Sequence, residues 1–503
     1  MKFNKLTFLL IAGAIINTMI SCSDDFLQVD PKGQFLSGSY YTDQEQAYTG
    51  LVAAYDVMRK NSGGFENMIT MMTAGSDDQY AGGGGASDGA GIQSFSNFTI
   101  SPTTIPQSFW NDYYQGIFRT NILLVKLPGV PMDATLKARY IAETKALRAF
   151  YYFNLVNLFK NIPLTTEPIS PDQFYNITQA KPADVYIQIE KDLTDAIAVL
   201  PGGINRVTES GRFNKGAAQA LLGKVYLYQG KNALAAAQLA LVNGTPGSTN
   251  QYGNRLLANY NDLWVVSNKY NTESILEVAH SSAGNSGWGN WGSGSDEGNT
   301  VNVMAGPRGY SRPVGSTAPN LPSGWSFNVF TQEFYDVIKT DPRFAATVLD
   351  LKALKTAGQA DYIPGYQDTG YFLNKFTPRQ TDVHTGAGDA VLNYKQNTYA
   401  IRLADTYLME AEALGGTGAR AQALLDAVRA RVGLPSVPVT LNAIADERRL
   451  ELAGEGFRFF DLVRTGKAAA KLSSRGFVAG KHDIFPIPYR ELENTKLVQN
   501  PNY

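Results

Sequence analysis

The chain of 503 residues contains a single cysteine and three histidines, which narrows the chemistry it can perform. One cysteine cannot form an internal disulfide bond. His280, His384 and His482 lie far apart in the sequence and lack the spacing of metal ligands. Charged residues make up 18% of the chain, the formal net charge is −1, and no cluster of lysines and arginines stands out. We therefore expect neither a histidine-based metal site nor a nucleic-acid partner.

Motifs of nucleotide sites and of metalloproteases are missing as well. The sequence has no P-loop and no His-Glu-x-x-His motif. The stretch Gly287–Gly292 formally matches the dinucleotide fingerprint, but Ser-Gly-Ser-Asp-Glu-Gly follows it and does not predict a helix for the pyrophosphate. Asp77 and Asp78, like Asp296 and Glu297, have the oxygen chemistry of calcium ligands, yet no complete ligand loop is visible and solvated loop acids explain them better. We predict no cofactor and leave a structural calcium ion open.

The N-terminus carries the longest apolar run of the chain. Two lysines precede the stretch Leu6–Ile16, a pattern typical of a secretory signal and too short for the ~20 residues that cross a bilayer. Cys22 follows Met-Ile-Ser, which resembles the lipobox of bacterial lipoproteins with methionine in place of the usual leucine. We predict that residues 1–21 are removed, that Cys22 is lipidated and anchors the protein to a membrane, and that residues 22–39 form a tether. An ordinary signal peptide with a chance cysteine is the alternative.

The rest of the chain has the pattern of a mainly α-helical globular protein. Hydrophobic residues make up 44% of the sequence. Apolar residues recur at steps of three and four, which is typical of helices with one buried face. The predicted helices cover residues 47–58, 109–127, 138–159, 182–200, 214–241, 399–414, 419–432 and 441–453.

Two helical segments resemble tetratricopeptide repeats. Leu222-Gly223-x-x-Tyr226 with Ala235 twelve residues after the glycine matches the Leu-Gly-x-x-Tyr…Ala pattern, in which small residues allow two antiparallel helices to touch. Segments 404–412 and 421–425 look like a second helix pair.

Two loop regions combine glycine with aromatic residues. Segment 75–91 is rich in glycine, and segment 281–326 holds three of the five tryptophans among Gly, Ser, Asn and Pro. Long loops in a compact protein are usually functional or disordered, and a disordered loop would not normally retain three tryptophans. Each of these tryptophans could bind a ligand, and the alternative is that its ring packs under its own loop. Trp110, in contrast, is expected in the core. The candidate ligand-binding residues are Trp288, Trp291, Tyr310 and Trp325, together with Phe65, Asp77, Asp78, Gln79 and Tyr80.

The C-terminal third carries an ordered series of motifs. These are Val-Arg-x-Arg-x-Gly-Leu at 428–434, Glu-Arg-Arg-x-Glu-Leu-x-x-Glu-Gly-x-Arg at 447–458, Pro-Ile-Pro-x-x-Glu at 486–491 and Gln-Asn-Pro-x-Tyr at 499–503. Together with Asp341-Pro-Arg at 341–343 and the helix start Asn-Lys-Gly-Ala-Ala at 214–218, the series resembles the SusD/RagB family of Bacteroidetes outer-membrane lipoproteins. The resemblance covers a body of residues 40–503, with a C-terminal SusD/RagB region at about 270–503.

The charged segment 447–464 alternates in sign. Residues three apart on a helix can pair, as Glu451 with Arg448 and Glu455 with Arg458. We predict buried or half-buried ion pairs here, with a role in specifying the fold. A catalytic site made of these carboxylates is the alternative.

The resemblance implies a SusD-like body of tetratricopeptide-type helix pairs with a loop-rich ligand face. It implies a surface-exposed, lipid-anchored protein of the outer membrane that captures oligo- or polysaccharide and delivers it to a SusC-like TonB-dependent transporter. It also implies that the protein is not an enzyme. The aromatic loop residues agree with a glycan ligand, because sugar rings present flat CH faces to aromatic rings. A peptide-binding RagB-like protein and a surface glycosidase are the alternatives.

Overall fold

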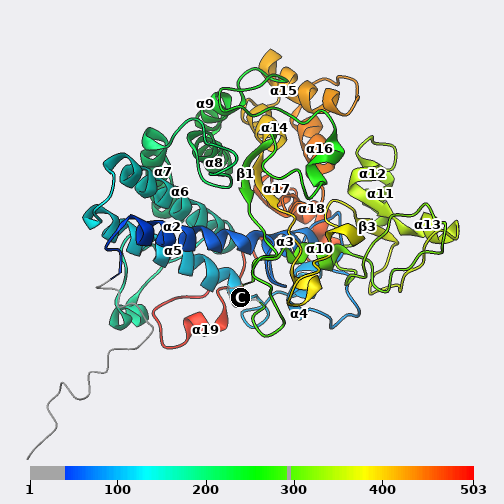
Figure 1. Cartoon of the computed structure of the whole chain (residues 1–503), viewed down its shortest axis with the longest axis horizontal. Coiled ribbons are helices and arrows are strands. Elements are labelled where there is room, and N and C mark those ends of the chain that lie inside the picture. Colours follow the sequence, from blue (N-terminus) through cyan, green and yellow to red (C-terminus); the bar gives the residue numbers. More distant parts are fainter. Residues whose placement is uncertain (1–39, 292–295) are drawn as a thin grey trace, which may run out of the picture. The chain divides into compact units, whose positions relative to one another are not determined.

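The computed structural model describes residues 40–291 and 296–503. The predicted signal peptide, Cys22 and the tether lie outside these residues, as does Gly292. Residues 43–503 form one unit in which helices dominate (Figure 1). Within the described part of the chain, no helix combines the length and the apolar character needed to cross a bilayer.

The N-terminal half contains the longest helices, and the sequence pattern located them to within a few residues. Asp43 begins the first of them, because its carboxylate accepts a hydrogen bond from the backbone N–H of Gln46 at 2.9 Å. The helices of this half are α2 (Gln44–Asp56), α3 (Met68–Ala74), α4 (Ala90–Ser96), α5 (Ser108–Lys126), α6 (Ala134–Phe159), α7 (Pro182–Val199), α8 (Lys215–Tyr228) and α9 (Asn232–Asn243).

The second half has shorter helices and four short strands. The helices are α10 (Thr300–Ala305), α11 (Gln332–Ile338), α12 (Phe344–Thr347), α13 (Leu351–Thr356), α14 (Leu403–Ala413), α15 (Gly418–Arg431), α16 (Leu441–Glu451), α17 (Arg458–Arg464), α18 (Ala468–Leu472) and α19 (Tyr489–Leu492). The 3-10 turns of the chain are η2 (Val57–Asn61), η3 (Leu127–Gly129), η4 (Pro171–Asn176), η5 (Tyr260–Trp264), η6 (Gln380–Asp382), η7 (Ala390–Leu392) and η8 (Ser473–Arg475).

Segment 214–241 contains two helices that pack closely, as the tetratricopeptide-like motif predicts. A Cβ on Gly223 of α8 would lie 2.6 Å from Cγ of Leu239 on α9, so only glycine allows this approach. Leu239 also packs with Met409 and Ala413 of α14 in one buried cluster. Helix α14 in turn packs against α15 as the predicted second pair.

The predicted helix 399–414 begins later than expected, because its first residues form a strand. Strand β4 (Thr398–Arg402) pairs antiparallel with β1 (Ser274–Val278), and Glu277 faces Tyr399 in the register. All residues of β4 are buried, so the apolar run that favoured a helix is the run of a buried strand. A second antiparallel pair joins β2 (Val348–Asp350) to β3 (Tyr371–Leu373).

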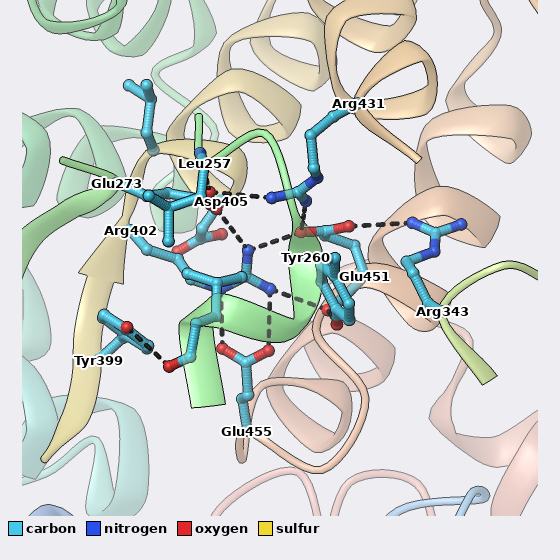
Figure 2. Close-up of polar contacts among 12 residues, drawn as sticks. Leu257, Tyr260, Glu273, Arg343, Tyr399, Arg402, Asp405, Arg431, Glu451 and Glu455 are labelled. Atoms are coloured by element: carbon cyan, nitrogen blue, oxygen red, sulfur yellow. Dashed lines mark hydrogen bonds and ion pairs between the residues drawn. The ribbon is translucent and has the colours of Figure 1, made fainter. Parts of the chain in front are cut away.

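A network of buried charges connects the elements of the C-terminal half (Figure 2). Glu451, fully buried at the end of α16, accepts hydrogen bonds from Nη1 of Arg402 at 2.6 Å and Nη1 of Arg343 at 3.0 Å, and pairs with Arg431. Five acids and five bases make up the network: Glu273, Asp341, Glu447, Glu451 and Glu455 with Arg343, Lys375, Arg402, Arg429 and Arg431.

The predicted buried ion pairs are therefore present, and Asp461 pairs with its helix neighbour Arg464, but Glu451 and Glu455 do not pair with Arg448 and Arg458. Glu455 pairs with Lys375 and Arg402, whereas Arg448 pairs with Asp405 and Asp461. Arg458 reaches back to Asp77 in the N-terminal half. The acids of segment 447–455 are thus enclosed and paired with arginine and lysine, which leaves their carboxylates unavailable to a substrate.

Candidate functional site

Two segments distant in sequence bring the loop tryptophans together. Trp288 and Trp291 lie on the loop after β1, and its backbone is held by the segment around η7. The side-chain oxygen of Asn393 accepts a hydrogen bond from the N–H of Ser286, and its side-chain nitrogen donates one to the carbonyl of Ser286, both at 2.8 Å. The carboxylate of Asp389 accepts a hydrogen bond from the N–H of Trp288 at 3.0 Å. Trp325 lies in an extended stretch after α10, where its N–H donates to the carbonyl of Val303 at 2.9 Å.

Four aromatic rings form a contiguous cluster that we call the aromatic platform: Phe65, Trp288, Trp291 and Trp325. Neighbouring ring centroids are 5.5 to 6.2 Å apart. Trp288 is 54% exposed and lies nearly parallel to Trp325, with 25° between the ring planes. Trp291 and Trp325 are half-buried and meet Trp288 and each other edge to face or stacked. One side of Trp288 is therefore open to a ligand, while the other side rests on a rigid aromatic support.

The glycine-rich loop fits closely against this platform. Gly89 has φ of +67°, and a Cβ at this position would lie 2.6 Å from the ring of Phe65. Gly83 has φ of +89°, and its Cβ would lie 2.5 Å from the ring of Phe327, which packs edge to face under Phe65. Two glycines thus allow backbone to approach the rings where any side chain would displace them.

Polar groups that the sequence pattern did not single out lie beside Trp325. Nη2 of Arg308 lies 3.3 Å from Asp88 Oδ2, and both side chains are partly exposed. Asp88 also accepts the N–H of Gly84 at 2.6 Å, which fixes it to the glycine-rich loop. The sequence could not identify Arg308 and Asp88 as a pair, because the two residues are 220 positions apart and no local pattern connects them.

The predicted polar members of the site lie in the interior instead. Asp77 accepts two hydrogen bonds of 2.8 Å from Arg458, and Asp78 accepts one of 2.7 Å from Nε of Arg449. Burial alone would raise the pKa of Asp77, but Arg458 and Arg449 hold the pKa below its usual value. Burial, together with the charge of Asp77, raises the pKa of Asp78. Gln79 is fully buried and donates to the carbonyl of Asn328. The structure does not bring these three side chains to the aromatic platform.

In residues 40–291 and 296–503, Tyr80 and Tyr310 make no ring contact with the aromatic platform. Both pack against the buried cluster that contains Leu321 and Phe372. The guanidinium of Arg475 lies 4.5 Å from the ring centroid of Tyr80, and the hydroxyl of Tyr310 donates to the carbonyl of Pro319 at 2.5 Å. Among the candidate residues, the structure thus gathers Phe65, Trp288, Trp291 and Trp325.

Two further expectations concern the core and metals. Trp110 is buried against Tyr114 and Phe159, as its place on a periodic helix predicts. In residues 40–291 and 296–503, no group of three or more His, Cys, Asp or Glu side chains is arranged to hold a metal ion.

Comparison with known proteins agrees with the C-terminal motifs. Residues 244–503 match the model of the SusD family, which is more than half of the chain. The chain belongs to the SusD family. Residues 45–227 match a second family described as "Starch-binding associating with outer membrane". The resemblance stated from the sequence is therefore confirmed.

Solved structures and curated relatives extend over nearly the whole chain. A "Laminarin binding SusD-like protein" is 67% identical, with a TM-score of 0.91 over 92% of this chain and 100% of that chain. "Surface glycan-binding protein A from Bacteroides thetaiotaomicron in complex with laminarihexaose" is 26% identical, with a TM-score of 0.79 over 91% of this chain and 100% of that chain. SusD-like protein P38 of Formosa agariphila is 25% identical over all of both chains. The mainly α, SusD-like fold predicted from the sequence is confirmed.

Proposed function

We propose that this SusD family member binds a β-1,3-glucan such as laminarin on the aromatic platform and does not cleave it. The observation that carries the proposal is the exposed ring of Trp288, stacked on Trp325 and supported from the side by Trp291. A ring held in this way presents a flat apolar face to water, and because it is already ordered, binding a ligand costs little further side-chain entropy. The similarity to a laminarin-binding protein and to a laminarihexaose complex supports this choice of ligand.

The groups around the platform suit a sugar chain. The CH faces of glucose rings lie on tryptophan, while the hydroxyl groups at the ring edge need donors and acceptors nearby. Arg308 donates and Asp88 accepts beside Trp325, and both are partly exposed. An open surface of this kind covers only one side of the sugar, so we expect modest affinity for an isolated oligosaccharide.

The proposal includes a place at the cell surface and a partner. We propose that Cys22 carries the lipid anchor in the outer membrane and that the protein acts as a lid on a SusC-like TonB-dependent transporter, to which it delivers the glycan. The second family description, which refers to association with the outer membrane, supports this location. Closure of the lid would cover the exposed side of the bound sugar and add contacts along the chain.

Calorimetric titration with laminarihexaose tests the binding site. Trp288→Ala should weaken binding by about tenfold, which corresponds to ~1.4 kcal/mol, while the melting temperature changes little because the ring is largely exposed. Tyr489→Ala is the matched control, because Tyr489 is also 54% exposed and is not part of the platform. Trp288→Ala protein that binds laminarihexaose as tightly as the wild type would place the site elsewhere.

A further inference from the structure

A second surface with exposed aromatic side chains lies between α5, the segment around η4 and the segment around α19. It is a groove of about 590 Å³ (α5 and α19 are labelled in Figure 1). This volume falls within the ~300–1,000 Å³ typical of ligand sites. We call it the aromatic groove; the lining residues used below are Asn111, Gln115, Phe118, Phe174, Tyr175, Arg490 and Glu493.

Helix α5 presents an exposed stripe to this groove. Asn111, Gln115 and Phe118 follow each other at steps of four and three, so they lie on one face of the helix. All three side chains are exposed, and Phe118 retains 43% of its accessible surface. Phe118 thus lies on the same solvent-facing stripe as the two amides and is only partly buried, unlike Trp110, which is 4% exposed.

The opposite wall carries two more exposed rings. Phe174 and Tyr175 are 48% and 59% exposed and lie on η4, in which no residue is buried. This turn is stabilised by a capping box between Ser170 and Gln173 rather than by packing. Its aromatic side chains are therefore not needed to hold the turn in place.

The groove also contains hydrogen-bonding groups that have no partner within the protein. Across residues 40–291 and 296–503, the side chains of Asn111, Gln115, Arg490 and Glu493 make no hydrogen bond or ion pair with another protein group. Glu491, beside them, is bonded to Gln107 at 2.9 Å. Amide, guanidinium and carboxylate groups thus stand free next to three exposed rings.

We infer that the aromatic groove is a second carbohydrate-binding site, which contacts a β-1,3-glucan chain independently of the aromatic platform. The inference rests on the proposed function for the identity of the glycan. Exposed rings together with unpaired donors and acceptors match sugar rings and their hydroxyl groups, whereas a protein contact of purely apolar character would leave these polar groups unpaired. Two sites on one protein raise the affinity for a long polysaccharide more than for a short oligosaccharide.

The test compares laminarin and laminarihexaose on the full-length protein. Phe174→Ala/Tyr175→Ala should bind laminarin roughly threefold to tenfold more weakly than the wild type, since a second contact with the same chain is lost. Its melting temperature should remain unchanged, because η4 buries neither ring. Trp288→Ala should retain residual laminarin binding, and adding the two groove substitutions should abolish it. Tyr489→Ala is again the control, because Tyr489 is exposed on α19 but does not line the groove.

Each alternative outcome has a defined meaning. If the groove variant binds laminarin within twofold of the wild type while Trp288→Ala is still impaired, the second site is overturned and the proposed function stays intact. If the groove variant binds laminarin normally but no longer co-purifies with an outer-membrane β-barrel, the second sugar site is also overturned, and the groove is assigned to a protein partner. Failure of the wild-type protein to bind laminarin at all contradicts the proposed function itself.

Discussion

Glu451→Gln provides a direct test of the buried charge network. The substitution keeps the size of the side chain but removes one negative charge from a set of five acids and five bases, which leaves the enclosed network with a net charge of +1. Burial alone would raise the pKa of Glu451, but Arg431, Arg402 and Arg343 hold the pKa well below its usual value. The carboxylate is therefore ionised at neutral pH, and its charge compensates three guanidinium groups.

The expected effect follows from this geometry. Breaking a buried ion pair by removing one partner costs about 3–5 kcal/mol, because the remaining charge stays buried without compensation. Unfolding entropy of ~2.1 cal/mol/K per residue amounts to about 1 kcal/mol/K for a unit of roughly 460 residues. We therefore expect the melting temperature of Glu451→Gln to fall by about 3–5 °C. Within the described residues, no hydrogen bond or ion pair joins the network to the aromatic platform, so laminarin affinity should remain unchanged.

Differential scanning fluorimetry or calorimetry at neutral pH measures the shift. Asp336→Asn is the control, because Asp336 and Lys339 form a 2.7 Å pair in which both side chains are about half exposed. Such a surface pair contributes little, and its loss should leave the melting temperature unchanged. If Glu451→Gln melts no lower than this control, the network does not stabilise the fold and the reasoning fails.

Two further predictions concern a buried histidine and a helix contact. Burial lowers the pKa of His280 to about 4 from the usual 6.5, so the folded protein binds this proton more weakly than the unfolded chain. The contribution of the neutral imidazole to stability is therefore complete above pH 6.5 and is lost as the pH falls toward 4. His280→Gln should thus show a smaller drop in melting temperature between pH 7 and pH 4.5 than the wild type; equal drops would show that folding does not lower the pKa of His280. Gly223→Ala should destabilise the protein by about 1–3 kcal/mol through overpacking against Leu239, whereas Gly129→Ala, with open space around its position, should not. Equal melting temperatures for these two variants would contradict the close helix contact.

The helical fold was accessible from the sequence because its signals are local. The 3.6-residue periodicity located α5, α6 and α7, and the Leu-Gly-x-x-Tyr pattern identified the close packing of α8 on α9 before any contact was known. The same local signal was misleading for residues 399–402, since a short buried apolar run has no periodicity that distinguishes a strand from a helix. Only the pairing with β1 decided it.

The ligand site depended on tertiary structure to a greater degree. The sequence marked the aromatic loop residues as candidates, but it could not distinguish Trp288, which is exposed, from Tyr310, whose hydroxyl is bonded to a neighbouring carbonyl. It placed Asp77 among the ligand-binding residues, whereas Arg458, from the other end of the chain, encloses it. It predicted that Glu451 pairs with Arg448 and Glu455 with Arg458, whereas Glu451, Glu455 and Arg458 find their partners outside segment 447–464. Propensity, capping and periodicity act between neighbours, so the sequence determined the helices and the family, while exposure and charge pairing depend on which distant segments meet, which only the folded chain decides.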